Sequence, residues 1–149
     1  MKTGKFIDFA REAEQRREHA LNAGNNGMIP HDLWRRIIPI AREYDDKNTD
    51  MAVLYSYLIA NVNGQPDNDR YMSAFPSVKR IAAETRIGQN RIAPLADALE
   101  AVGLLKTAYD YSSNKREKLY YPQYYTTLSD DEIRANLAEW KRRLDEKKR

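Results

Sequence analysis

The chain has 149 residues, of which 42% are hydrophobic and 32% charged, with a formal net charge of +3 and no cysteine. This length fits one domain, and the lack of cysteine excludes disulfide frameworks, thiolate metal sites and cysteine nucleophiles. A mean hydropathy of −0.81 and the lack of a long apolar run exclude a membrane helix and a secretory signal, so we expect a cytoplasmic protein.

The N-terminal segment is predicted to form a charged helix over residues 3–23, which ends at Gly24. Its apolar side chains form a thin stripe that Arg16 and Arg17 interrupt. Because such a helix is marginal alone in water, we expect it to need a partner surface. Residues 1–27 are therefore taken as a helical extension of the main domain.

The next segment supplies the first expected core elements. Trp34 is expected in the core, and Pro39 is expected to end or kink any helix there. Residues 51–62 place apolar side chains at helical spacing, which predicts a core helix. A short strand is expected at residues 71–75, after a polar loop.

The middle of the chain predicts two short helices joined by a tight turn. Ser77 is expected to cap the first helix, and Gly88 to supply the left-handed backbone conformation that the turn needs. The second helix is expected to begin at Gln89 or Asn90 and to end at Gly103. Two helices joined in this way form a helix-turn-helix unit.

A hairpin and a last helix complete the chain. Residues 104–111 and 117–121 flank a polar turn and predict two paired strands. Ser129 and Glu132 form a capping box at the start of the last helix. This helix carries one apolar stripe at heptad-like spacing, made of Ile133, Leu137, Trp140 and Leu144. The stripe either packs on its own chain or joins two chains; we favour a homodimer contact, with the N-terminal helix as packing partner.

The order helix, turn, helix, hairpin is that of a winged helix-turn-helix. The sequence PSVKRIAAETRIG, followed by IAPLADALEAVGLL, resembles the winged-helix modules of bacterial regulators. It is also similar to the N-terminal domains of plasmid and phage replication initiators and of DnaD-type primosomal proteins. The resemblance spans residues 48–122. It implies an α+β, mostly α fold, in which a winged-helix domain (28–125) has helical extensions at both ends (1–27 and 126–149).

The resemblance also implies binding to double-stranded DNA. The second helix, residues 89–102, is expected to enter the major groove and to read base edges with its first turn, while cations around it contact phosphates. The residues assigned to DNA in this way are Ser77, Lys79, Arg80, Arg86, Gln89, Asn90, Arg91, Lys115, Arg116 and Lys118. Residues 75–121 hold eight Lys or Arg against five Asp or Glu, which favours a polyanion-facing surface. Pro94 and Asp97 depart from the family's pattern, since neither adds a cation to this helix.

The remaining side-chain clusters point to no enzyme. The two histidines lie far apart, and the acidic clusters lack the pattern of a metal-binding loop, so we expect no catalytic residue, no metal and no cofactor. Five of the ten tyrosines fall within residues 111–125. Tyrosine suits half-buried hairpin strands, and base stacking on single-stranded DNA is the alternative interpretation.

Three functions follow as expectations. The first is an accessory or initiator-like factor in the replication or transfer of a plasmid, phage or integrative element, with replication or transfer proteins as further partners. The second is a dimeric transcriptional regulator. The third is a winged-helix scaffold for protein–protein interaction, which requires no DNA at all.

Overall fold

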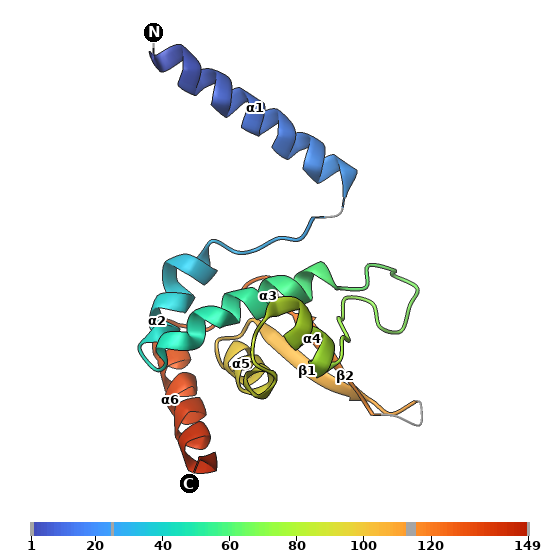
Figure 1. The fold of residues 1–149 in the computed structure, drawn as a ribbon, viewed down its shortest axis with the longest axis vertical. Coiled ribbons are helices and arrows are strands. Elements are labelled where there is room, and N and C mark those ends of the chain that lie inside the picture. The colour runs from blue at the N-terminus through green and yellow to red at the C-terminus, as the bar shows by residue number, and fades with distance from the viewer. Residues whose placement is uncertain (1, 25, 113–115, 149) are drawn as a thin grey trace.

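The computed structural model describes residues 2–24, 26–112 and 116–148, and within them the chain is a mostly helical α+β protein (Figure 1). Two strands form an antiparallel sheet among six α-helices and two short irregular helical turns. In chain order the elements are α1 (Lys2–Ala23), a π-helical turn (Leu33–Ile37), α2 (Ile38–Arg42), a 3-10 turn (Asp46–Thr49), α3 (Asp50–Ala60), α4 (Val78–Thr85), α5 (Gln89–Ala101), β1 (Leu105–Asp110), β2 (Glu117–Pro122) and α6 (Asp130–Lys147). None of the helices described is long and apolar enough to cross a membrane.

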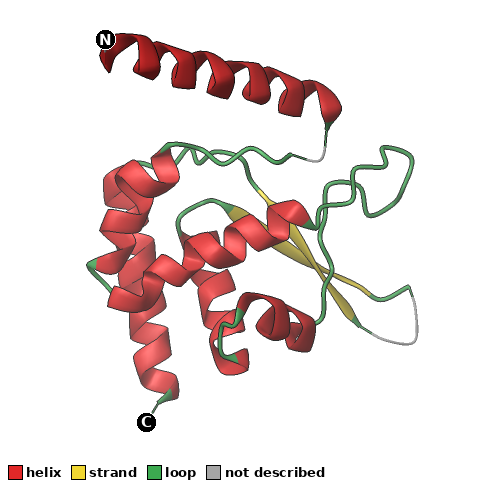
Figure 2. Ribbon diagram, turned by 45° about the horizontal axis from the view of Figure 1, so that its top comes forward, coloured by secondary structure: helices red, strands yellow, loops and turns green. Residues whose placement is uncertain are grey.

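Helix α1 forms where the sequence predicts it and stands apart from the remaining elements in both views (Figures 1 and 2). Its large apolar side chains, among them Phe6, Phe9 and Leu21, are exposed. The side chain of Asn26 closes the end of the helix by donating to the carbonyl of Ala20 at 2.5 Å. Within one chain α1 does not lie against the last helix, because α6 lies on the far side of the domain (Figure 1).

The segment before α3 differs from expectation at one aromatic residue. The π-helical turn gives way to α2 just before Pro39. Pro39 lies in the first turn of α2, where its missing N–H removes no helical hydrogen bond. Leu33 and Ile37 turn inward and are fully buried, whereas Trp34 points outward and is exposed. The prediction that Trp34 lies in the core is therefore wrong.

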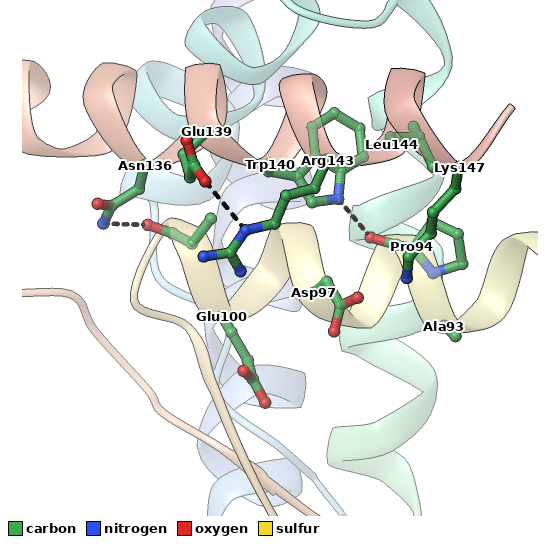
Figure 3. A pocket seen from close by; sticks show the side chains of 11 residues that line it. Ala93, Pro94, Asp97, Glu100, Asn136, Glu139, Trp140, Arg143, Leu144 and Lys147 are labelled. Atoms are coloured by element: carbon green, nitrogen blue, oxygen red, sulfur yellow. Dashed lines mark hydrogen bonds and ion pairs between the residues drawn. The ribbon is translucent and has the colours of Figure 1, made fainter. Parts of the chain in front are cut away.

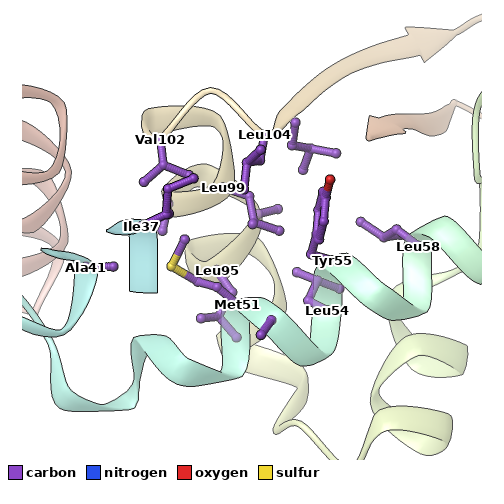
Figure 4. Packing of buried hydrophobic residues seen from close by; sticks show 14 of the residues in the cluster. Ile37, Ala41, Met51, Leu54, Tyr55, Leu58, Leu95, Leu99, Val102 and Leu104 are labelled. Atoms are coloured by element: carbon purple, nitrogen blue, oxygen red, sulfur yellow. The ribbon is translucent and has the colours of Figure 1, made fainter. Parts of the chain in front are cut away.

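Helix α3 is the central helix of the core, as its spacing predicts. Its inward side carries Met51, Leu54, Tyr55 and Leu58, all fully buried. These side chains point toward α5, where Leu95 and Leu99 meet them (Figure 4). The hydroxyl of Tyr55 donates to the carbonyl of Gln123 at 2.9 Å, and burial raises the pKa of Tyr55 to about 12.

The turn between α4 and α5 has the predicted position but a different left-handed residue. The Ser77 side chain caps α4 by accepting from the Arg80 amide at 3.1 Å, as predicted. At the other end Arg86 adopts φ 66°, and its N–H donates to the carbonyl of Ala82 at 2.9 Å. Gly88 has φ −56° and serves as the N-cap of α5. The prediction for Gly88 is wrong because the helix end itself, rather than the turn, imposes the left-handed conformation.

A glycine does impose the end of α5. Gly103 adopts φ 85°, and the amide of Leu104 donates to the carbonyl of Leu99 at 3.0 Å, which closes the helix as predicted. The chain then enters the hairpin, in which Leu105 pairs with Pro122 and Asp110 with Glu117.

The strand expected at residues 71–75 is shorter than predicted. Only Ala74 pairs with the sheet, through an antiparallel bridge to Tyr120 with both hydrogen bonds at 2.8 Å. Met72 has φ 68°, which breaks the extended conformation just before the bridge. The segment nevertheless lies against β2, so the spatial order is Ala74, β2, β1.

Helix α6 belongs to the same core as the other helices. The predicted capping box of Ser129 and Glu132 is present. The apolar stripe is covered within one chain, because Ile133 and Leu137 are fully buried, Trp140 is 8% exposed and Leu144 is half-buried against the core. The assignment of this stripe to a homodimer contact is therefore corrected: α5 and α2 already cover it.

Candidate nucleic-acid interface

The first turn of α5 is an exposed part of the predicted interface. Gln89 and Asn90 are exposed, and Gly88 before them brings no side chain to cap the helix. A helix N-terminus carries unpaired N–H groups and a partial positive charge, which suit an anion. The amide side chain of Asn or Gln carries one acceptor and one donor, which complement the donor and the acceptor that adenine presents in the major groove.

Arg91 does not join these two residues. Its guanidinium pairs with the carboxylate of Asp50, at the start of α3, and donates to the carbonyl of Lys47, in the 3-10 turn before it, at 3.2 Å. In the free protein this side chain therefore ties α5 to α3. Sequence spacing missed the pair because Asp50 lies 41 residues away.

The phosphate-contacting cations assigned around α4 divide into two kinds. Lys79 and Arg86 are exposed, and among the residues described neither forms an ion pair. Arg80 instead pairs with Glu84 at 2.6 Å, and this hydrogen bond raises the pKa of Arg80 and lowers that of Glu84. Lys79 and Arg86 are thus the cations on this helix pair that are available to a polyanion.

The hairpin supplies two further cations, each placed over an aromatic ring. The guanidinium of Arg116 lies 4.3 Å from the centre of the Tyr109 ring, and the ammonium of Lys118 lies 5.2 Å from that of Tyr120. Contact with a ring holds such side chains in place while their hydrogen-bond donors stay free. Lys115, the third hairpin cation assigned to DNA, lies outside the residues described.

A groove connects the hairpin with the two helices. The start of α4, the middle of α5 and the facing side of the hairpin line it, and its volume is about 520 Å³. Its lining includes Phe75, Ser77, Ala93, Tyr109, Arg116 and Lys118. The structure thus brings Ser77 together with the two described hairpin cations.

Beyond its first turn the exposed side of α5 does not suit a polyanion. Ala93, Asp97 and Glu100 occupy it, so this side carries two carboxylates and no cation. On the flank that faces α6, the indole N–H of Trp140 donates to the carbonyl of Pro94 at 2.9 Å (Figure 3). The first turn is therefore the part of α5 whose charges suit a polyanion.

One organising residue of this surface escaped the sequence interpretation. Arg70 pairs with Asp110 at 2.8 Å and with Glu117 at 3.1 Å, and its guanidinium lies 4.6 Å from the centre of the Phe75 ring. Asp110 and Glu117 are direct partners across the hairpin, and like charges at such positions repel unless a cation joins them. Hydrogen bonds from Ser112, followed by one from Arg70, lower the pKa of Asp110 to about 2. In the sequence, the two carboxylates expected to face each other across the hairpin are what indicates that a cation such as Arg70 lies between them.

Neither a metal site nor similarity to known proteins adds information about the function. Within residues 2–24, 26–112 and 116–148, no group of three or more His, Asp or Glu side chains is arranged to hold a metal ion. No protein-family model, curated protein sequence or solved structure matches the chain. The geometry of the chain itself is therefore the basis for its proposed function.

Proposed function

We propose that this chain is a winged-helix protein that binds duplex DNA through the first turn of α5, the start of α4 and the hairpin. The observation that carries the proposal is the bridge between Ala74 and Tyr120. With this one-residue bridge in the place of a first strand, the order resembles the helix, strand, helix, helix, strand, strand of a winged helix, in which the first strand lies beside the last. We infer the winged-helix fold from this order and from the resemblance of residues 48–122.

The charges favour duplex DNA as the ligand. Lys79 lies at the start of α4 and Arg86 in the turn before α5, while Arg116 and Lys118 lie on the hairpin, across the groove from α5; cations around a helix in this way favour phosphate contacts that hold it against bases. From the resemblance we propose a role in replication or transfer of a plasmid, phage or integrative element. A dimeric transcriptional regulator uses the same surface, so base preference rather than binding separates these two roles.

Two observations favour a second candidate, a scaffold that binds proteins. Asp97 and Glu100 place negative charge beside the first turn of α5, and α1 presents Phe6, Phe9 and Leu21 to solvent. A scaffold of this kind binds no DNA. Duplex binding is therefore the property that separates the two candidates.

The test is fluorescence anisotropy with a labelled blunt duplex. The variant Lys79→Gln/Arg86→Asn removes two cations from the proposed interface, and Asn tolerates the left-handed backbone at position 86. We expect the Kd to rise about tenfold or more, since a charged hydrogen bond contributes about 1.5 kcal/mol or more.

The matched control is Arg11→Gln/Arg17→Gln, which makes the same charge change on exposed residues of α1. We expect this variant to bind like the wild type. Equal weakening by both variants would show that net charge alone governs binding and would refute the interface. Absence of duplex binding by the wild type would leave the scaffold as the better proposal.

A further inference from the structure

We propose that the groove between α5 and the hairpin holds an unpaired nucleotide, so that the protein binds DNA where a single strand leaves a duplex. This inference rests on the proposed function, because it places the duplex on the first turn of α5. It adds a substrate class, a junction between double-stranded and single-stranded DNA, that duplex binding alone does not include.

The chemistry of the groove fits a nucleotide that has left the base stack. Tyr109 supplies an aromatic ring, Arg116 and Lys118 supply cations, and Ala93 leaves room on the α5 side. The one carboxylate of the lining, Glu117, pairs with Arg70. Proteins that bind single strands combine these features: bases stack on aromatic rings while cations follow the phosphates. The groove volume of about 520 Å³ is of the size of a small-molecule site.

The exposure of the aromatic rings separates this groove from ordinary strand packing. Tyr120 is 2% exposed and belongs to the core, as strand packing predicts. Tyr109, Tyr111 and Phe75, in contrast, are 43%, 68% and 40% exposed. The rings of Tyr109 and Tyr111 lie 6.3 Å apart between centres, and Arg116 lies over the Tyr109 ring. These rings contribute little to the core, so their exposure needs another explanation.

A paired base cannot use these rings. Bases within a duplex stack on one another and present only their edges in the grooves. An aromatic ring can therefore stack only on a base that has left the duplex. Because the groove adjoins α5 beyond its first turn, a strand that separates next to the bound duplex would enter it directly.

The experiment compares the Kd for a blunt duplex with that for the same duplex carrying a single-stranded tail of about six nucleotides, on either the 5′ or the 3′ end. We expect one tailed form to bind about fivefold or more tightly than the blunt form, the least that one base stacked on an aromatic ring contributes. Tyr109→Leu should abolish this preference, so that tailed and blunt forms bind this variant equally, since leucine keeps the apolar bulk but not the flat ring.

The matched control is Tyr125→Leu, because Tyr125 is 72% exposed and does not line the groove. A fluorescent base, 2-aminopurine, at the first unpaired position gives an independent measurement: stacking on Tyr109 should quench it in the wild type and not in Tyr109→Leu. Circular dichroism of both variants checks that the hairpin stays folded.

The outcomes separate this inference from the proposed function. Equal affinity for blunt and tailed DNA, or equal effects of Tyr109→Leu and Tyr125→Leu, would overturn the groove assignment and leave duplex binding intact. Binding of tailed DNA without any binding of the blunt duplex would overturn the proposed function and support the groove as a single-strand site. Absence of binding to either DNA would overturn both.

Discussion

Replacement of Trp140 tests whether α6 is part of the fold of a single chain. The indole is 8% exposed, and its N–H donates to the Pro94 carbonyl at 2.9 Å, so it fastens α6 to the middle of α5. A tryptophan buries about 200 Å², which at about 25 cal/mol/Å² is worth about 5 kcal/mol. The buried methyl group of alanine keeps a small part of this burial energy, so Trp140→Ala should lower the free energy of unfolding by about 4 kcal/mol.

Trp140→Phe separates the contribution of the hydrogen bond to stability from that of apolar burial. It keeps most of the apolar bulk and loses the N–H, so we expect a loss of about 1–2 kcal/mol. Urea unfolding followed by circular dichroism measures both variants at several protein concentrations. The midpoint should not depend on concentration, because α5 and α2 of the same chain cover the stripe. A midpoint that rises with concentration, with Trp140→Ala converting a dimer into a stable monomer, would refute this reasoning.

Three further predictions concern the backbone, a carboxylate and the first turn of α5. Gly103→Ala should lower the free energy of unfolding by more than about 1 kcal/mol in thermal melts, since φ is 85° and the new Cβ would collide with a neighbouring threonine; Gly24→Ala, with φ 79° and open space around it, should cost less. Asp110→Asn should be less stable than the wild type at pH 7, and because the folded-state pKa of about 2 lies below the ordinary value, the difference should shrink as pH falls from about 4 to about 2; a constant difference would contradict the assignment. Arg91→Ala should lower stability by at most about 1 kcal/mol without changing base preference, whereas Asn90→Ala should relax base preference by about 1–3 kcal/mol in competition binding; the reverse pattern would show that Arg91 reads bases.

The features that sequence reasoning predicted correctly depend on neighbouring residues. Ser77 and Ser129 cap helices through side chains that reach three residues ahead, and Gly103 ends a helix by its own backbone freedom. The helical spacing of apolar side chains in residues 51–62 and the polar turn of the hairpin are equally local. Such signals lie within a few positions of the residues they affect, so a single sequence contains them.

The features that it missed depend on contacts between distant residues. The pair of Arg91 with Asp50 and the pairs of Arg70 with the hairpin span 40 or more residues. The burial of the α6 stripe depends on the surface that α5 and α2 present, and the exposure of Trp34 depends on which side of its turn faces the core. The spacing of apolar residues indicates which side of a helix is buried, but it does not indicate which element covers that side.

The salt dependence of duplex binding tests the central proposal most directly. Four described cations, Lys79, Arg86, Arg116 and Lys118, face the proposed duplex, and each phosphate contact contributes about −0.9 to the slope of log K against log salt concentration. For a blunt duplex we predict a slope of about −3.6 for the wild type and about −1.8 for Lys79→Gln/Arg86→Asn. An affinity that does not change with salt concentration, or an unchanged slope in the double variant, would contradict the proposal that this surface binds DNA.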